Sequence, residues 1–199
     1  MILGVLLSGR GSNFSAIAEN VLAGKLQCEI GCVISNVASA PGLERARQWG
    51  LNACFLDPKG KERVAFDAEV MATLRSHAVD YVCLAGYMRL LSEEFVNAFP
   101  NRILNIHPSL LPAFPGLNAQ RQALKYGVRY SGCTVHFVDA GLDTGPIILQ
   151  AVVPVLADDD EESLSARILK EEHQIYSEAI RLISEGKVQT EARQVRILS

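Results

Sequence analysis

The chain has 199 residues, of which 49% are hydrophobic and 21% charged, and its formal net charge is −3 at pH 7. Such a composition excludes a disordered chain and predicts a single domain, 1–199, that is large enough for a sizeable core. The chain has neither a long Lys/Arg block nor the ~18 to 20 consecutive apolar residues that span a bilayer, which indicates a cytoplasmic protein that binds neither nucleic acid nor a membrane.

Short apolar runs alternate along the chain with longer amphipathic segments. The apolar runs predict strands at 2–8, 28–35, 53–56, 80–86, 102–107, 132–139 and 146–155. Helices are expected at 13–23, 42–49, 62–77 and 160–184. This alternation predicts an α/β fold with a mostly parallel, doubly wound, Rossmann-like sheet that has helices on both faces.

Three segments of this pattern carry more specific predictions. The runs 132–139 and 146–155 are joined by the short loop AGLDTG, which has no room for a crossover helix, so they should form an antiparallel pair. The final long helix begins with DDDEES, whose carboxylates suit a helix N-terminus, and a metal site is the weaker alternative. The helix at 62–77 has apolar residues that lie largely along one stripe: Val64, Phe66, Val70, Met71 and Leu74.

The N-terminal stretch MILGVLLSGRGSN lacks the basic start and the cleavage site of a signal peptide, so it is interpreted as a buried strand that enters a glycine-rich turn. In SGRGSN (8–13) the glycines allow backbone N–H groups to approach an anion at a helix N-terminus, and Ser12 and Asn13 add donors. Phe14 stands where a dinucleotide fingerprint has its third glycine, and the Walker lysine is missing, so a monophosphate is the predicted ligand. The alternative is a tight turn that Ser12 or Asn13 caps.

The stretch LNIHPSLLP (104–112) places polar side chains at the end of a strand. Residues i and i+2 of a strand share a face, so Asn105 and His107 should point to one spot, and Pro108 should end the strand. Ligands of open α/β sheets bind at the carboxyl ends of strands, where both this tip and the 8–13 loop are expected. The alternative is that Asn105 caps a turn and His107 is a half-buried structural histidine.

Asp143, in the loop sequence DAGLDTGP, is a third polar candidate. A carboxylate near His107 would favour the imidazolium form and orient the ring. Asp139 is a rival, and ordinary turn residues are the alternative for both. An Asn, a His and an Asp without a nucleophilic side chain suit acyl transfer to an external nucleophile, because amide and imidazolium donors stabilise a tetrahedral oxyanion.

Other nucleophile and metal sites find no support in the residue spacing. Ser109 lies outside a G-x-S-x-G elbow. Cys133 and His136, three apart on a strand, face opposite ways, which favours packing over catalysis. The four histidines lack a metal-ligand spacing, so we predict no metal. Five cysteines without a C-x-x-C are expected to be buried free thiols: Cys28, Cys32, Cys54, Cys83 and Cys133.

Several segments closely resemble the glycinamide ribonucleotide formyltransferases, the folate-dependent enzymes of purine synthesis. The likeness is collinear over nearly the whole chain and includes SGRGSN, GLERAR (42–47), LAGYMRLLS (84–92), NIHPSLLPAFPG (105–116), GCTVHFVDAGLDTGPIILQ (132–150) and EEHQIY (171–176). NIHPSLLP together with LDTGP at this spacing is specific to the folate-dependent formyltransferase superfamily. The tRNA formyltransferases and formyltetrahydrofolate hydrolases of that superfamily normally carry a further domain.

The resemblance implies an enzyme that passes the formyl group of 10-formyltetrahydrofolate to the amine of glycinamide ribonucleotide (GAR). Asn105 would hold the oxyanion, His107 would donate a proton, and Asp143 would raise the pKa of His107 and organise proton transfer through a water. The phosphate loop lies in the N-terminal half, and the catalytic residues lie in the C-terminal half. The residues implied at the GAR site are Gly11, Ser12, Asn13, Pro108 and Glu172. Those implied at the folate site are Arg63, Met88, Arg89, Leu90, Leu91, Asn105, Val138, Asp139, Ala140, Gly141 and Asp143.

Some positions depart from the family pattern or allow another interpretation. Leu169 stands where relatives often have a glutamine on the ribose side, and it cannot make that hydrogen bond. Asn118 stands where a relative has a histidine, and Arg63 could be an ordinary exposed helix arginine. Water or an amino sugar nucleotide is an alternative acceptor, and a non-catalytic folate- or nucleotide-binding module is an alternative class. The expected assembly is a monomer or homodimer.

Overall fold

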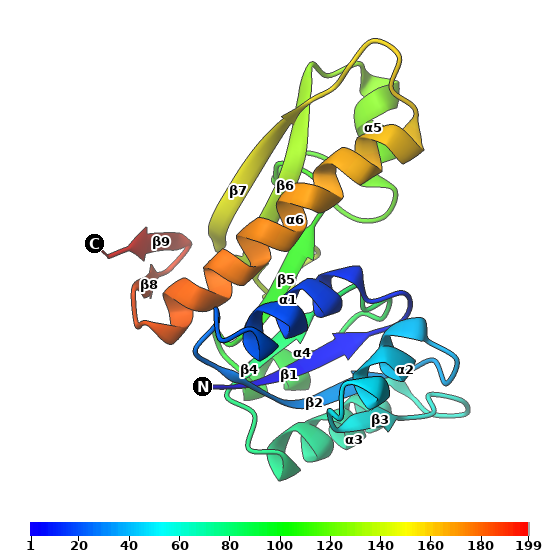
Figure 1. Ribbon diagram of the computed structural model, residues 1–199, viewed down its shortest axis with the longest axis vertical. Coiled ribbons are helices and arrows are strands. Elements are labelled where there is room, and N and C mark those ends of the chain that lie inside the picture. Colours follow the sequence, from blue (N-terminus) through cyan, green and yellow to red (C-terminus); the bar gives the residue numbers. More distant parts are fainter. Residues whose placement is uncertain (199) are drawn as a thin grey trace. The chain divides into compact units, whose positions relative to one another are not determined.

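The computed structural model describes residues 1–198, and the chain forms two compact units that meet in the sequence between Leu104 and Asn105. The first unit comprises residues 1–104 and the second begins at residue 105. Figure 1 labels the helices and strands of both.

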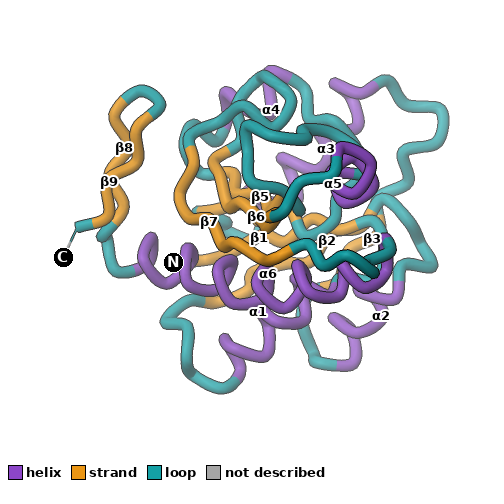
Figure 2. The backbone as a smooth tube through the Cα atoms, turned by 90° about the horizontal axis from the view of Figure 1, so that it is seen from above, coloured by secondary structure: helices purple, strands orange, loops and turns teal. Residues whose placement is uncertain are grey.

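The first unit is a parallel α/β layer structure. Its strands are β1 (Ile2–Leu7), β2 (Glu29–Ser35), β3 (Ala53–Phe55) and β4 (Tyr81–Leu84). Strand β1 pairs in parallel with both β2 and β4, and β3 pairs in parallel with β2. The helices are α1 (Ser12–Leu22), α2 (Pro41–Gln48), α3 (Arg63–Ser76) and α4 (Glu93–Ala98). Helices α1 and α2 lie on one face of these strands and α3 and α4 on the other (Figure 2).

Burial explains why β1 is a continuous apolar run rather than an alternating one. Leu3 and the stretch Val5–Leu7 have no exposed surface, because helices cover both faces of this parallel layer. In α3, three residues of the apolar stripe, Phe66, Val70 and Leu74, are fully buried, and Met71 is half-buried. Val64, on the same stripe, is 47% exposed in the first turn of the helix, whereas the polar Asp67 is fully buried.

The second unit combines an antiparallel strand pair with a long helix. Strand β5 (Ile103–His107) runs into it, and α5 (Ala119–Tyr126), β6 (Tyr130–Phe137), β7 (Ile147–Pro154) and α6 (Glu161–Ser184) follow. Strands β6 and β7 pair in antiparallel register from Tyr130 with Pro154 onward, which confirms the predicted pair. Helix α6 packs along β6, β7 and α5 (Figure 1). A separate hairpin, β8 (Val188–Glu191) with β9 (Gln194–Ile197), ends the described chain.

Side chains cap two of the helices. Asp160 and Ser163 form a reciprocal capping box at the start of α6: the Asp160 carboxylate accepts from the Ser163 N–H, and the Ser163 hydroxyl accepts from the Asp160 N–H. The acidic run of the sequence therefore acts at a helix N-terminus, as expected. Ser92 caps α4 in a similar way, because its hydroxyl accepts from the Phe95 N–H.

The environment of the five cysteines differs in part from the expectation. All five are free thiols; Cys32, Cys83 and Cys133 are buried, whereas Cys28 and Cys54 are only half-buried. Burial raises the pKa of the Cys32 thiol to about 12 and that of the Cys133 thiol to about 12. Within residues 1–198, no helix combines the length and apolar character that crossing a membrane requires.

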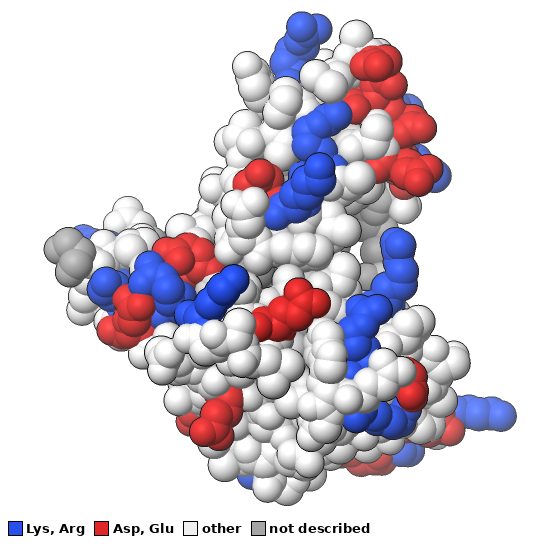
Figure 3. Space-filling view, viewed as in Figure 1, with Lys and Arg blue, Asp and Glu red and all other residues white. Residues whose placement is uncertain are grey.

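Charged residues of both signs are interspersed over the end of α6 and the β8–β9 hairpin (Figure 3). Arg181 pairs with Glu178 and Glu185 along the helix, and Arg196 pairs with Glu191 across the hairpin. Exposed pairs of this kind contribute about 0–1 kcal/mol each to stability. They give this surface a mixed sign rather than a basic stripe.

Candidate active site

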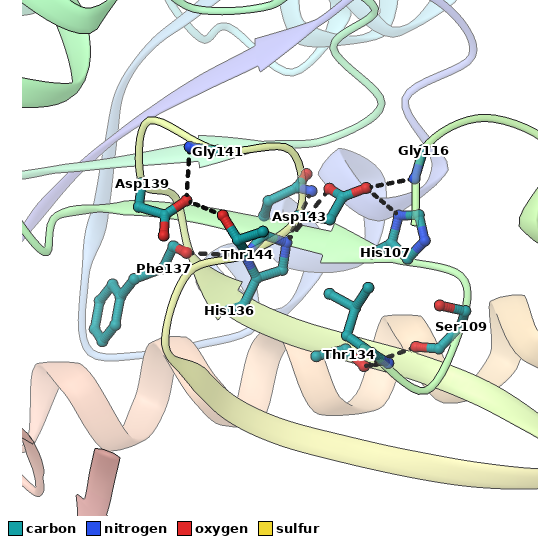
Figure 4. A network of polar contacts seen from close by, with 12 residues as sticks. His107, Ser109, Gly116, Thr134, His136, Phe137, Asp139, Gly141, Asp143 and Thr144 are labelled. Carbon is teal, nitrogen blue, oxygen red and sulfur yellow. Dashed lines mark hydrogen bonds and ion pairs between the residues drawn. The ribbon is translucent and has the colours of Figure 1, made fainter. Parts of the chain in front are cut away.

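His107 is the last residue of β5, and Pro108 follows it, as the sequence predicted. The residue is 5% exposed, and both ring nitrogens face oxygen atoms. Nε2 lies 2.9 Å from the carbonyl oxygen of Phe114, and Nδ1 lies 3.4 Å from Oδ2 of Asp143 (Figure 4). A carbonyl or carboxylate oxygen only accepts, so the doubly protonated imidazolium satisfies both contacts.

Asp143 lies in the loop between β6 and β7, with φ at 54°, a left-handed conformation that aspartate tolerates better than most residues. Its Oδ2 accepts a 2.8 Å hydrogen bond from the Gly116 N–H and faces His107. Its Oδ1 lies 3.8 Å from Nε2 of His136. The side chain is 11% exposed, so this carboxylate interacts with both rings in a poorly hydrated site.

His136, on β6, is the site residue that sequence reasoning missed. Its Nε2 lies 3.2 Å from Nδ2 of Asn105, and its Nδ1 donates to the Phe137 carbonyl at 2.8 Å. Burial lowers the pKa of the His136 ring, although the Phe137 carbonyl and the Asp143 carboxylate act in the opposite direction. Asn105, His107 and Asp143 therefore meet as predicted, with His136 as a fourth member.

Hydrogen bonds beneath the site hold the segment that follows His107. The Thr134 hydroxyl donates to the Ser109 carbonyl at 2.7 Å and accepts from the Leu111 N–H at 3.0 Å. The Ser109 hydroxyl donates a hydrogen bond to the Ala113 carbonyl. Ser109 is therefore a structural residue here, in agreement with its rejection as a nucleophile. The Leu111–Pro112 peptide bond is cis.

Asp139, the rival carboxylate, occupies a different place in the same loop. Its Oδ1 accepts from the Gly141 N–H at 3.0 Å and from the Thr144 hydroxyl at 2.7 Å (Figure 4). These bonds shape the 138–144 turn. Asp143 rather than Asp139 is the carboxylate that contacts His107.

The glycine-rich loop of the first unit has the form that anion binding needs. Gly11 precedes α1 with φ at 65°, and no side chain caps the helix. A Cβ at Gly11 would lie 3.1 Å from Cα of Gly42, so loop 9–11 approaches α2 closely, and the positive φ of Gly11 favours glycine there. Ser12 begins the helix and Asn13 follows it, at the positive end of the helix dipole.

The predicted folate segment 88–91 is attached to the same loop region of the first unit. The Met88 N–H donates to the Ser8 hydroxyl, and that hydroxyl donates to Asn36 Oδ1. Met88 and Leu90 are 68% and 65% exposed, an apolar surface that a flat aromatic ligand could cover. Arg63 is exposed at the first position of α3.

The remaining positions singled out in the sequence, two on α6 and one before α5, differ in burial. Glu172 is 7% exposed on the face of α6 that packs against β6, and its charge contributes to the raised pKa of the Cys133 thiol after burial itself. Leu169 is half-buried one turn earlier in the helix. Asn118 is exposed, with φ at 57°, directly before α5.

Comparison with known proteins identifies the family. A model of the formyl transferase family matches residues 1–180, which covers sequence from both units. The chain belongs to the formyl transferase family. The phosphoribosylglycinamide formyltransferase of Escherichia coli (strain K12) is 46% identical over 185 residues, 92% of this chain and 87% of that protein.

Two further relatives extend this finding. The trifunctional purine biosynthetic protein adenosine-3 of Drosophila melanogaster is 48% identical over 185 residues, but the chain spans only 14% of its length. Glycinamide ribonucleotide transformylase 1 from Symbiobacterium toebii, a solved structure, has a TM-score of 0.98 and 57% identity over 100% of this chain and 94% of that one. The predicted α/β fold is confirmed, as is the predicted formyltransferase resemblance.

Proposed function

We propose that this chain transfers the formyl group of 10-formyltetrahydrofolate to the amine of GAR, and that its two units act together as one formyltransferase domain. The observation that carries the proposal is the buried pair of His107 and Asp143 beside Asn105, in a chain of the formyl transferase family. The set has acid, base and oxyanion donor without a nucleophile, which suits direct transfer between two bound substrates.

The chemistry assigns one role to each side chain. The amine lone pair of the acceptor attacks the formyl carbon, a C–N bond forms, and the carbonyl electrons move to oxygen. N–H groups of Asn105 and His107 donate to that oxyanion. The amine then loses a proton, the folate nitrogen gains one, and its bond to carbon breaks. Asp143, through its contact with Nδ1, would orient the His107 ring, and Nε2, which contacts the Phe114 carbonyl in this structure, would turn its N–H to the substrate oxygen.

Binding roles are assigned to residues of each unit. Backbone and side-chain donors of Gly11, Ser12 and Asn13 would take the acceptor's phosphate, because α1 has no acidic residue in its first turn. Pro108 and Glu172 would contact the acceptor's amide and ribose. The folate would take the 88–91 and 138–143 segments, with Arg63 near its anionic end. The proposed transfer uses no metal ion.

The test mixes the purified protein with 10-formyltetrahydrofolate, with and without GAR, and follows the absorbance change as the folate loses its formyl group. Deformylation that depends on GAR and yields formyl-GAR supports the proposal. Deformylation at the same rate without GAR would refute the proposal and indicate that the protein hydrolyses 10-formyltetrahydrofolate. Bound folate without any turnover would indicate a binding module.

A further inference from the structure

The amide of Asn105 has a single protein contact among the hydrogen bonds of the site, and that contact is a histidine. Nδ2 of Asn105 lies 3.2 Å from Nε2 of His136. An Asn side chain can be turned over at little cost unless a neighbour distinguishes its NH₂ from its carbonyl oxygen. The protonation state of His136 therefore decides which end of the Asn105 amide faces the ring.

The other side of the His136 ring fixes its tautomer. Nδ1 lies 2.8 Å from the Phe137 carbonyl, an acceptor, so Nδ1 carries the proton. In the neutral ring Nε2 then has a lone pair, which accepts from the Asn105 NH₂ group. If Nε2 were protonated, it would face that NH₂ donor to donor and would turn to Asp143, whose Oδ1 is 3.8 Å away.

The hydrogen-bond partners of the two histidines favour different protonation states. His107 faces two acceptors and is satisfied as a cation. His136 faces one acceptor and one donor and is satisfied as a neutral ring. Burial and the neighbouring His107 lower the pKa of His136, while the Asp143 and Asp139 carboxylates oppose them. The ring is 2% exposed, so water does not replace its contacts.

We propose that neutral His136 is the positioning residue that sets the orientation of Asn105, holding one N–H of the amide so that the other N–H, rather than the carbonyl oxygen, is presented to the formyl oxygen. This inference rests on the proposed formyl transfer. An inverted amide would place an oxygen lone pair against the developing oxyanion, which costs more than losing the donor.

The kinetic test compares three variants with the wild-type enzyme. His136→Leu removes the acceptor at similar volume and should lower kcat about 10- to 100-fold, with KM for both substrates within about threefold, because the effect falls on the transition state. His136→Gln offers a carbonyl oxygen near the position of Nε2 and should recover at least half of that loss on a logarithmic scale. The control His77→Leu, at the end of α3 in the first unit, should leave kcat unchanged.

Equal activity of His136→Leu and wild type would overturn the inference, as would a Gln variant as poor as the Leu variant with the same melting temperature. A second measurement does not depend on turnover. Two-bond proton–nitrogen-15 correlation spectra at pH 7 should show His136 protonated at Nδ1 and bare at Nε2. A protonated Nε2 would overturn the inference even if GAR-dependent transfer is observed, and absence of that transfer in the wild type would refute the proposed function instead.

Discussion

Replacing Asp143 by Asn tests the central electrostatic contact of the site. The substitution keeps the shape, Asn also tolerates the left-handed backbone, and its carbonyl oxygen can still accept from the Gly116 N–H. What is lost is a negative charge 3.4 Å from the His107 ring. At an effective dielectric constant of about 20, two unit charges at 3.4 Å attract by about 5 kcal/mol. This gross attraction sets the scale of the change in barrier.

Each 1.36 kcal/mol of barrier is about a tenfold change in rate, so kcat of the Asp143→Asn variant should fall by about 10²- to 10⁴-fold, the usual range for loss of general acid–base assistance. The assay is the steady-state rate of GAR-dependent deformylation, with thermal melting to confirm the fold. Asp158→Asn, an exposed carboxylate before α6, is the matched control. A kcat within threefold of wild type for Asp143→Asn would refute the reasoning.

Three further predictions concern the loop, the acid stability and the thiols. Gly11→Ala should destabilise the fold by about 1–2 kcal/mol, since a Cβ is strained at positive φ. The same substitution should raise KM for GAR. An unchanged melting curve and an unchanged KM would contradict the proposed role of the turn. The Arg167 guanidinium holds the pKa of Asp159 below its ordinary value, so this pair stabilises the protein above about pH 4 and the benefit is lost as pH falls through the folded-state pKa. Asp159→Asn should therefore lower the melting temperature at pH 7 and make the melting temperature fall less steeply between about pH 5 and 2. An unchanged slope would show that this pair does not contribute to the loss of stability in acid. In the native protein a thiol reagent at about pH 8 should modify only the half-buried Cys28 and Cys54. The buried thiols of Cys32, Cys83 and Cys133 should react only on unfolding, and rapid modification of all five would contradict this prediction.

Local rules were sufficient for the tip of β5. Period-two alternation placed Asn105 and His107 on one face, and Pro108 marked the end of the strand. The same rules failed for His136, because every residue from Ser131 to Phe137 is buried and the strand offers no polar face to mark the site. Its role depends on the partners that pairing brings near it. A polar residue inside an otherwise buried strand was the available signal.

The missed elements have physical causes as well. Helix α4 has 6 residues, fewer than two turns, which is too short for a clear apolar period. The β8–β9 hairpin turns at Ala192 and Arg193 rather than at the glycine or asparagine that usually marks such a turn, although Ala192 has φ at 53°.

The hydrogen bond between His107 and the Phe114 carbonyl has a consequence for how the site meets its substrate. Phe114 has φ at 52°, which for a bulky residue stores about 1–3 kcal/mol of backbone strain. The Nε2 proton of His107 is thus already engaged by a carbonyl of a segment with strained backbone. Under the proposed function, the formyl oxygen can receive this proton only after the Phe114 carbonyl gives it up, so substrate binding would be coupled to a local rearrangement of His107 and the Phe114 segment.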